Sequence, residues 1–530
     1  MSEKPVEQEL VQAMTGTERP SALMTDGYKF SMAQAGFPLR KEKFYLTLRR
    51  GGPYFIPFDL VDVAQRLVPE MPTTKEQGFL QANGYGMNPA MEEALKGELN
   101  VWAAPKGSWV IAREPIMVPS GSSFLVSWLE PLAIMLNYPI QVATAYLNGQ
   151  RDFETTCWEE SLIVQLTLTE TARLTGVDES YTVTCLSRDY GEGLKRNIAA
   201  IKEALGGKLN RAFEVGMRGA TCMEQHRLAL MHCREAGMLK TSNVFLAWEL
   251  YMTPVGTTGH EHQQRWGNDK AGFEAIRDMR PEQPSYLFDT YNPIEIGIPA
   301  AMSVMETDER PCSMRFDSGD QDAQFLKILA AVRREYPAEG QQDSYFEDRP
   351  NLNLIFEDGY TADKTAINET FCAAWKWPED RRHYGYGGYI VTDPSPSAYG
   401  RNMVSAAYKL TETGGQPRMK FSGTPGKESI PGKPVILRRI RQDRHDPKRE
   451  QPPKGYQHAY SVIAQEGESI PAFRPLDPVD NRHERQYELR TATELTGATL
   501  IPFLSPQTQE LIARLTAERD QMVEDANANS

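Results

Sequence analysis

Three short strings place acidic, basic and glycine residues where an apolar run ends. The first, RFDSGD (Arg315–Asp320), carries a guanidinium, two carboxylates, a serine and a glycine. The second, EDG, contains Asp358–Gly359, and the third, YGYGG, ends at Gly387–Gly388. Glycine lets an anion approach the backbone, and a free helix N-terminus offers N–H groups to a phosphate. Taken in series, with Arg218 upstream of them, the strings predict a pyrophosphate site.

The acids of the first string have an alternative interpretation. A carboxylate just before a helix accepts hydrogen bonds from the first N–H groups of that helix. Asp317 and Asp320 could therefore cap the helix that Phe325, Leu329 and Val332 indicate by their i, i+4, i+7 spacing. From the residues alone, capping and ligand binding stay open for both acids.

A histidine also follows an apolar run. GTTGH (Gly256–His260) puts the imidazole of His260 after a glycine-rich turn, where it would face the same strand ends; the alternative is a structural histidine. His262 could form a metal pair with it, but no third ligand follows at a suitable spacing, so we expect no transition-metal site. His226 and His232 lie in a helical stretch and are expected to be structural.

The elements that must hold these residues alternate between strand and helix after about residue 147. Apolar strands such as Asn351–Gly359 lead into helical periodicity, with polar residues or glycine at the strand ends. Repeated strand–helix units are typical of a parallel α/β barrel or doubly wound sheet, whose functional groups gather at the carboxyl ends of the strands. Earlier, Lys43–Leu60 and Val101–Gly121 alternate like short strands, and Trp128–Leu147 is apolar enough for a buried helix.

The two ends of the chain carry weaker signals. Residues 1–20 are predicted to be a mobile lead-in, and the basic segment Arg438–Gly455 a solvated loop. Ser505 and Pro506 suit the N-cap and first position of a helix, and Leu511, Ile512 and Leu515 would share one face of it. A surface helix is therefore predicted near the C-terminus.

Composition limits the class of protein. A chain of 530 residues suggests several domains, and a formal net charge of −13 argues against nucleic acid as a partner. No apolar run could span a membrane and the first residues lack the apolar core of a secretory signal, so we expect a cytoplasmic protein. The six cysteines have no C-x-x-C spacing and are expected to be reduced. Motifs of serine hydrolases, P-loop enzymes and dinucleotide folds are missing.

Eight motifs, in order, resemble those of one enzyme family. They are LMTDGYKFSMAQAGFP, EVGMRGA, KTSNV, PVGTTGHEHQQ, MRFDSGD, FEDGYTADK, YGYGG and YKLTETGGQPRMKFSGTPGKESIPG. From about Leu23 to Pro434 the chain resembles nicotinate phosphoribosyltransferases and their nicotinamide-using relatives, which are type II phosphoribosyltransferases. The resemblance implies an N-terminal mixed α/β domain, residues 1–145, an irregular α/β-barrel-like catalytic domain, residues 146–410, and a C-terminal segment, residues 411–530, that packs back on the N-terminal domain.

The resemblance also implies a reaction. Nicotinate would displace pyrophosphate from phosphoribosyl pyrophosphate, coupled to ATP hydrolysis, and form nicotinate mononucleotide for NAD salvage. Such a displacement passes through an oxocarbenium-like centre, so it needs alignment and charge stabilisation rather than a protein nucleophile. The resemblance further implies Mg²⁺, ATP as co-substrate and a homodimer with a shared active site. Mg²⁺ would be bound through pyrophosphate, with Asp317 as the candidate protein ligand.

Each position that matches a motif has an implied role. Asp26 and Tyr28 would reach across the dimer interface, with Tyr28 stacked on the pyridine ring and Val215 on its other face. Arg218 would contact nicotinate or the product phosphate, and His260 would be phosphorylated from ATP. The ring, ribose, Mg²⁺-pyrophosphate and 5-phosphate would be held by Arg315, Asp317, Ser318, Asp358, Gly359, Gly387 and Gly388.

Ser242 bears on the choice between nicotinate and nicotinamide. The nicotinamide-using relatives carry an aspartate here, which accepts the amide N–H₂ and repels a carboxylate, whereas Ser242 can donate to a carboxylate. GHEHQQ also resembles the nicotinate branch, but a single Arg218 followed by glycine resembles the nicotinamide branch. We expect nicotinate, with nicotinamide as the alternative. A catalytically silent binding protein is disfavoured because Asp317, His260 and Arg218 are all present, and a quinolinate enzyme would need a basic cluster that is not visible here.

Overall fold

The computed structural model describes residues 4–178, 180–280, 282–306, 310–335, 351–421, 428–432, 436–439, 456–458, 503–504 and 506–528. The predicted solvated loop lies outside these residues from position 440 on, and so does the N-cap predicted at Ser505. No helix in the described ranges has the length and apolar character to cross a membrane.

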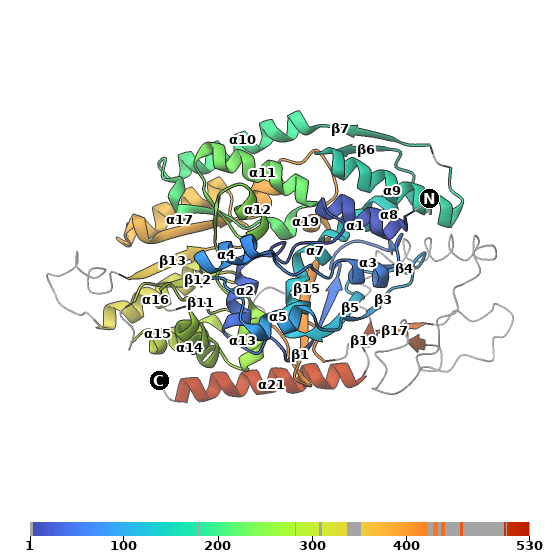
Figure 1. The fold of residues 1–530 in the computed structure, drawn as a ribbon. Helices are drawn as coiled ribbons and strands as arrows, with labels where there is room; N and C mark the ends of the chain where they lie inside the picture. The colour runs from blue at the N-terminus through green and yellow to red at the C-terminus, as the bar shows by residue number, and fades with distance from the viewer. Residues whose placement is uncertain are drawn as a thin grey trace.

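A seven-stranded parallel sheet forms the centre of the larger domain (Figure 1). Its order is β10-β9-β8-β14-β13-β12-β11, and each pair of neighbours is parallel. The strands are β8 (Ala212–Glu214), β9 (Lys240–Thr241), β10 (Thr253–Pro254), β11 (Ser285–Leu287), β12 (Cys312–Phe316), β13 (Leu352–Phe356) and β14 (Arg382–Tyr386). Since β8, the first in sequence, pairs with β14, the last, the sheet curls into a partial barrel. The predicted α/β class with a barrel-like domain is confirmed.

Helices connect these strands and begin or end where the sequence provides caps. The helices are α10 (Ser187–Ala204), α11 (Met223–Ala236), α12 (Val244–Glu249), α13 (His260–Trp266), α14 (Asp269–Met279), α15 (Ile298–Met305), α16 (Gln321–Glu335) and α17 (Ala362–Ala374). Asn268 and Thr361 accept hydrogen bonds from the first turns of α14 and α17, and α11 ends at Gly237 in the left-handed conformation.

A second, antiparallel sheet belongs to the N-terminal domain and has the order β16-β15-β1-β5-β3. Its strands are β1 (Lys41–Thr47), β3 (Asn100–Ala103), β5 (Pro115–Ser122), β15 (Ala407–Thr413) and β16 (Gln416–Pro417). The chain therefore returns from the barrel to this sheet in β15, so position 410 lies inside a strand that pairs with β1. This return places residues of β15 opposite the carboxyl ends of the parallel strands.

Helices complete the N-terminal domain. Residues 6–15 form α1 (Val6–Thr15), whose Leu10, Val11 and Met14 are buried, so the prediction of a mobile lead-in is wrong for this part of the chain. The apolar residues of α1 are few and stand among acids, of which Glu7 pairs with Lys106 at 2.7 Å. The predicted buried helical region consists of α6 (Ser123–Trp128), α7 (Glu130–Met135) and α8 (Asn137–Leu147), followed by α9 (Trp158–Thr175).

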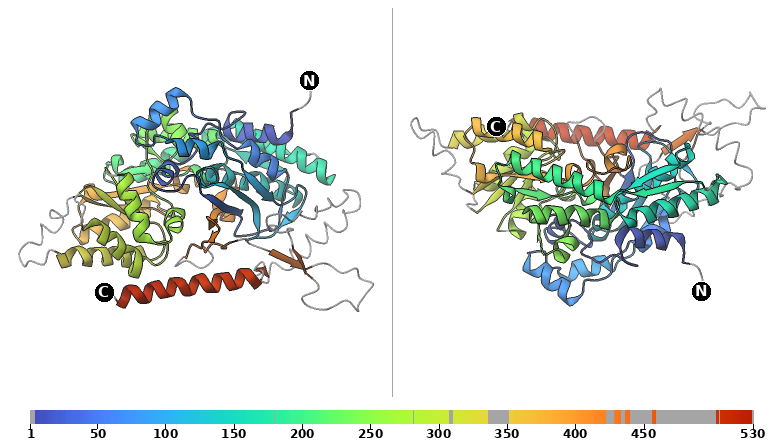
Figure 2. Two further views of the ribbon diagram at one scale, coloured as in Figure 1. Left: turned by 60° about the horizontal axis from the view of Figure 1, so that its bottom comes forward. Right: turned by 90° about the horizontal axis from the view of Figure 1, so that it is seen from above.

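The C-terminal helix α21 (Pro506–Ala528) lies along one side of the molecule (Figure 2). It packs against η3 (Pro293–Gly297), and Leu515 joins a small apolar cluster with Tyr291, Met419 and Phe421. Within residues 411–530, β15 and β16 thus join the N-terminal sheet, whereas α21 packs on the barrel domain. The expectation that the whole segment packs on the N-terminal domain differs from the structure in this respect, because the apolar face of α21 meets η3.

Candidate active site

A cavity of about 440 Å³ lies at the carboxyl ends of the parallel strands, where the two domains meet. Eleven of the residues predicted for the site line it: Tyr28, Val215, Arg218, His260, Arg315, Asp317, Ser318, Asp358, Gly359, Gly387 and Gly388. A second cavity of about 870 Å³ shares Tyr28, Val215 and Arg218 with the first and includes Asp26 and Ser242 in its lining. The structure thus brings every predicted site residue to one region.

Asp26 and Tyr28 enter the site of their own chain. The N–H of Gly27 donates to the carbonyl of Ser242 at 2.8 Å, and Asp26 forms an antiparallel bridge with Asn243 at the end of β9. These backbone contacts place the segment before α2 (Gly27–Gln34) between the ends of β9 and β10. These contacts are made within the one chain described, and the expected reach across a dimer interface stays a prediction.

Glycine is required where this segment crosses the end of β10. A Cβ atom on Gly27 would lie 2.6 Å from the carbonyl oxygen of Val255, and one on Gly256 would lie 2.3 Å from the backbone nitrogen of Tyr28. Atoms of neighbouring residues do not approach this closely, so a side chain at either position would push the two segments apart. The glycines of TDGY and PVGTTGH thus serve the approach of Tyr28 to the strand ends.

Asp26 and Ser242 form a buried pair beside the ring-binding positions. The Ser242 hydroxyl donates to Oδ1 of Asp26 at 2.6 Å, while Oδ2 of Asp26 has no hydrogen-bond partner among the residues that the structure describes. Burial raises the pKa of Asp26, and Arg218 and Ser242 partly oppose this shift. Ser242 was expected to donate to the substrate, but its hydroxyl proton is already used by Asp26.

The two acids of RFDSGD have different positions. Oδ1 of Asp320 accepts from the N–H of Ala323 at 3.0 Å, so this exposed acid caps α16. Asp317 faces the cavity, where Oδ1 accepts from Arg315 at 3.0 Å and Oδ2 lies 3.1 Å from Nε2 of His260. Burial would raise the pKa of Asp317, but His260 and Arg315 hold it well below the usual range. Capping therefore applies to Asp320 and the candidate ligand role to Asp317.

Arg315, in β12, contacts residues that follow β10, β12 and β13. One guanidinium nitrogen donates to the Thr257 hydroxyl at 2.7 Å, and the other lies 2.9 Å from a carboxylate oxygen of Glu357 as well as contacting Asp317. The side chain is 8% exposed, so these contacts take up most of its donors. Arg315 thus orients Asp317 and the loop that precedes His260.

His260 is the first residue of α13 and presents its ring to four polar groups. Nδ1 lies 3.2 Å from the Thr290 hydroxyl, and Nε2 lies 2.6 Å from the ammonium of Lys420 and 3.8 Å from Asp289. Burial lowers the pKa of His260, and Lys420 lowers it further. Nε2 thus lies between the Lys420 ammonium, which can only donate, and the Asp317 carboxylate, which can only accept. The lowered pKa favours a neutral imidazole, whose Nε2 lone pair would face Lys420 when the proton is on Nδ1.

Sequence reasoning missed a group of cations opposite the strand ends. Arg49, Arg401, Lys409 and Lys420 line the cavity from the side of β15 and α19 (Arg401–Val404). Burial and neighbouring cations lower the pKa of Lys409 to about 7 and that of Arg401 to about 10. Both lysines lie within the last motif, but their spacing indicates no chemistry until β15 pairs with β1. Because these cations lie close together and repel one another, the cavity is suited to bind a polyanion.

The loop after β13 has an unusual backbone. Asp358 adopts a φ of 70°, which is uncommon for a residue other than glycine, and Gly359 follows with a φ of 68°. Thr361 then caps α17. At the neighbouring strand, the N–H of Val215 donates to the carbonyl of Tyr386 at 2.8 Å, which puts the ring-binding position beside Gly387. Strained loops of this kind are concentrated at ligand-binding sites.

His262, which was considered as a metal ligand, and the two histidines expected to be structural have partners inside the fold. His262 contacts the carbonyl of Gly272 at 2.8 Å, and burial lowers its pKa to about 3. His226 is fully buried, with Nε2 3.0 Å from Glu214, and His232 lies 3.4 Å from Glu235. His262 is therefore turned away from the cavity that His260 faces.

The sequence is similar to those of several curated enzymes that share one name. No protein-family model matches the chain. It is 25% identical over 441 residues to the human nicotinate phosphoribosyltransferase, a match that covers 79% of this chain and 77% of the human one. It is similarly 25% identical over 438 residues to nicotinate phosphoribosyltransferase 2 of Arabidopsis thaliana, covering 78% and 73% of the two chains.

Solved structures show the same fold. The nicotinate phosphoribosyltransferase of Porphyromonas gingivalis superposes with a TM-score of 0.51 at 19% identity, covering 77% of this chain and 96% of that one. At these identities the likeness concerns the fold alone, whereas the sequence matches span most of the chain. The resemblance that the eight motifs indicate is confirmed, and the chain is related along most of its length to the nicotinate phosphoribosyltransferases.

Proposed function

We propose that this protein is a nicotinate phosphoribosyltransferase, which makes nicotinate mononucleotide and pyrophosphate from nicotinate and phosphoribosyl pyrophosphate with ATP hydrolysis, in NAD salvage. The observation that carries the proposal is that an aromatic and cationic ring site adjoins a strand-end polyanion site, in two cavities that share lining residues. The relatives' names give the substrate class.

The ring site would hold nicotinate between Tyr28 and Val215, with its carboxylate toward Arg218. These three residues line both cavities, so a planar ring there would have one edge toward the larger cavity and its nitrogen toward the strand ends. In the reaction a bond forms between the pyridine nitrogen and C1 of the ribose, and the bond from C1 to the pyrophosphate oxygen breaks. Aligning the two partners is the main contribution that the protein can make to this step.

The leaving pyrophosphate would lie among Arg49, Arg401, Lys409 and Lys420, and the 5-phosphate at the loops that contain Gly359 and Gly387–Gly388. Asp317 and Asp358 would bind ribose hydroxyls. Charge that develops on the leaving group would then be opposed by cations already in place, in a partly buried site.

The proposed use of ATP centres on His260. In the tautomer that carries its proton on Nδ1, the Nε2 lone pair could attack the γ-phosphorus of ATP: the N–P bond forms, the bond to the bridging oxygen breaks, and ADP leaves. Lys420 would stabilise the transferred phosphoryl group, and the Nδ1–H contact with Thr290 would fix the ring.

Mg²⁺ is proposed as the metal that accompanies these phosphates. Potential ligand atoms of His260, Asp289 and Asp317 lie within 4.8 Å of one another, and Oδ1 of Asp289 is buried with no hydrogen-bond partner in the described part of the chain. Carboxylate oxygens suit Mg²⁺ better than an imidazole does, so Asp289 and Asp317 would hold it. The metal would neutralise charge on the phosphates when bound.

Nicotinamide is the second candidate substrate, and one observation favours it. The free Oδ2 of Asp26 lies in the ring-site cavity and could accept an amide N–H, although Ser242 stands where an aspartate is expected in nicotinamide-using enzymes. The test is mononucleotide formation by purified protein with phosphoribosyl pyrophosphate and Mg²⁺, comparing the two pyridines with and without ATP. Turnover of nicotinate stimulated by ATP supports the proposal. Turnover of nicotinamide alone, or of neither pyridine, overturns it.

A further inference from the structure

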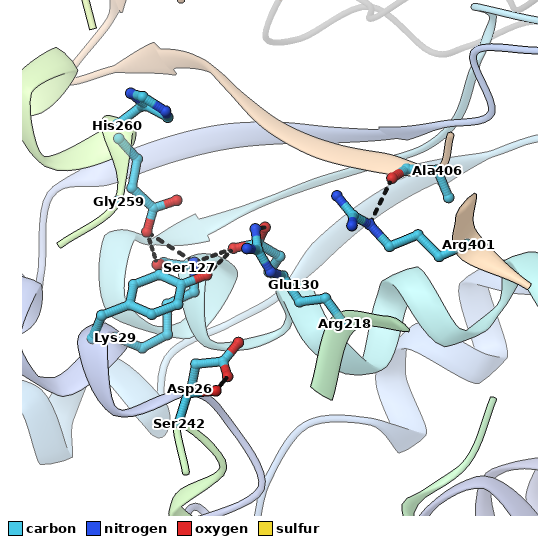
Figure 3. A network of polar contacts seen from close by, with 12 residues as sticks. Asp26, Lys29, Ser127, Glu130, Arg218, Ser242, Gly259, His260, Arg401 and Ala406 are labelled. Atoms are coloured by element: carbon cyan, nitrogen blue, oxygen red, sulfur yellow. Dashed lines mark hydrogen bonds and ion pairs between the residues drawn. The ribbon is translucent and has the colours of Figure 1, made fainter. Parts of the chain in front are cut away.

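Glu130, the first residue of α7, is buried at the centre of the ring site. Its Oε2 accepts from the Tyr28 hydroxyl at 2.9 Å. The same oxygen accepts from the Lys29 ammonium, and Oε1 lies 3.4 Å from a guanidinium nitrogen of Arg218 (Figure 3). The side chain is 7% exposed. One carboxylate thus contacts the two residues that the proposed function assigns to the pyridine ring and its carboxylate.

A second carboxylate connects this group to the helix of His260. The Lys29 ammonium, which is fully buried, also donates to Oε1 of Glu261 at 3.0 Å, and the Ser127 hydroxyl donates to the same oxygen. Glu261 follows His260 in α13. Lys29 therefore bridges two carboxylates, one at the ring site and one beside the candidate phosphorylation site.

The chain of charges ends in the N-terminal sheet. Arg265, one turn along α13, lies 3.6 Å from Glu261 and makes a two-pronged contact with Glu42 of β1, with Nε and Nη2 each 2.9 Å from a carboxylate oxygen. Planar contacts of this kind fix geometry better than single ones do. Glu130 is thus held through Lys29, Glu261 and Arg265 to a strand that is paired on both sides.

The cations that contact Glu130 keep its carboxylate ionised. Burial would raise the pKa of Glu130, but Lys29 and Arg218 lower it to about 2. A buried carboxylate that stays ionised and accepts from three donors cannot rotate without leaving cations unpaired, which is strongly unfavourable. Among the three contacts, that with Arg218 is the longest, so the guanidinium retains donors for a ligand.

We propose that Glu130 is a positioning residue for the ring site, whose anchored carboxylate fixes the Tyr28 hydroxyl and the Arg218 guanidinium in the geometry that receives nicotinate. This inference rests on the proposed function for the identity of the ligand. It assigns no chemical step to Glu130, which acts only through the two side chains that would touch the ring.

The test compares E130Q, which keeps the shape of the side chain but removes its charge, with Y28F, which keeps the ring but removes the hydroxyl. Each variant should raise KM for nicotinate roughly tenfold, as expected for loss of a hydrogen bond to a charged group. KM for phosphoribosyl pyrophosphate should stay within about twofold, because its site is held by other residues. E93Q, at an exposed position of α5 (Pro89–Leu95), is the matched control and should behave as wild type.

The double variant E130Q/Y28F separates positioning from general stability. If Glu130 acts through the Tyr28 hydroxyl, the double variant should be little worse than the poorer single variant. Fully additive effects, or a wild-type KM for nicotinate in E130Q, would overturn the inference. If E130Q does not fold, Y28F alone must still raise KM for nicotinate selectively, and a wild-type value in Y28F overturns the inference.

An NMR measurement that needs no catalytic activity tests the role of Glu130 independently of the proposed function. Wild-type protein that turns over neither pyridine contradicts the proposed function. Tyrosine labelled with ¹³C at Cζ still reports on the Tyr28 hydroxyl by NMR, with Y28F to assign the signal. E130Q should shift that signal, E93Q should not, and an unshifted signal in E130Q overturns the role of Glu130.

Discussion

The ammonium of Lys420 lies 2.6 Å from Nε2 of His260, and the two residues come from different domains. Lys420 follows β16 of the antiparallel sheet, while His260 begins α13 of the barrel domain. The same ammonium is 3.6 Å from Asp289 and 3.9 Å from Asp317. The contact therefore joins the cation group on one side of the cavity to the acids on the other.

Replacing Lys420 should weaken phosphorylation of His260. In K420M the Nε2 lone pair loses its donor and the transferred phosphoryl group loses a cation, so we expect phosphoenzyme formation to fall roughly 10–100-fold. H260A should abolish phosphoenzyme and ATP hydrolysis and leave slow synthesis without ATP. Acid-labile labelling from γ-labelled ATP measures both. Wild-type labelling in K420M would exclude the assigned role of Lys420.

The two acids of RFDSGD provide a matched pair. D317N should lower synthesis by about 100-fold or more, because it removes a charge at the reacting centre. D320N should cost at most about 1 kcal/mol of stability through a weaker helix cap, with nearly normal turnover. Steady-state rates and thermal unfolding distinguish the two effects. Equal losses of activity in both variants would contradict the separation of roles.

Lys409 should make polyanion binding depend on pH. Its pKa is lowered to about 7, so the free enzyme carries this charge below pH 7 and loses it as the pH rises. Affinity for phosphoribosyl pyrophosphate should therefore fall between pH 6 and pH 8, with proton uptake on binding at the upper end. Calorimetry in buffers of different ionisation enthalpy measures this uptake. K409R keeps its charge throughout, so uptake unchanged in K409R would assign the effect to another group.

The position of Tyr28 allows a test by subunit mixing. In a site made by one chain, an inactive Tyr28→Ala protein mixed with an inactive D317N protein should stay inactive, because neither chain holds a complete set. In the homodimer with a shared site that the resemblance implies, mixed dimers would contain one intact site. Co-expression of the two variants and assay of the purified mixture decides between the arrangements. Recovered activity would show that the contacts of Asp26 with Ser242 form between chains.

The strand-end residues were predictable because their signal is local. Asp317, Asp358 and Gly387–Gly388 each follow an apolar strand, and parallel strands bring their carboxyl ends together whatever the order of the strands. Distinguishing Asp317 from Asp320 required the structure, because both fit a cap equally well until the helix is seen to start at Gln321.

The cations and Glu130 were not predictable in the same way. Lys409 and Lys420 reach the cavity only because β15 returns to pair with β1, a contact between distant parts of the chain. Glu130 lies in an apolar helical region, where a single acid gives no sign of the partners that it will meet. The ordered helix α1 was missed because its apolar face is short and interrupted by acids.

The pairing of β8 with β14 has a consequence for how the protein is made. These strands open and close the barrel in sequence, and the Val215 to Tyr386 hydrogen bond forms only when the last strand has been synthesised. Contacts between such distant segments require a long loop to close and form slowly. Val215, at the ring site, and the loop that contains Gly387–Gly388 should therefore come together late in folding. A nascent chain that stops before β14 would lack the strand that pairs with β8 and the loop that contains Gly387–Gly388.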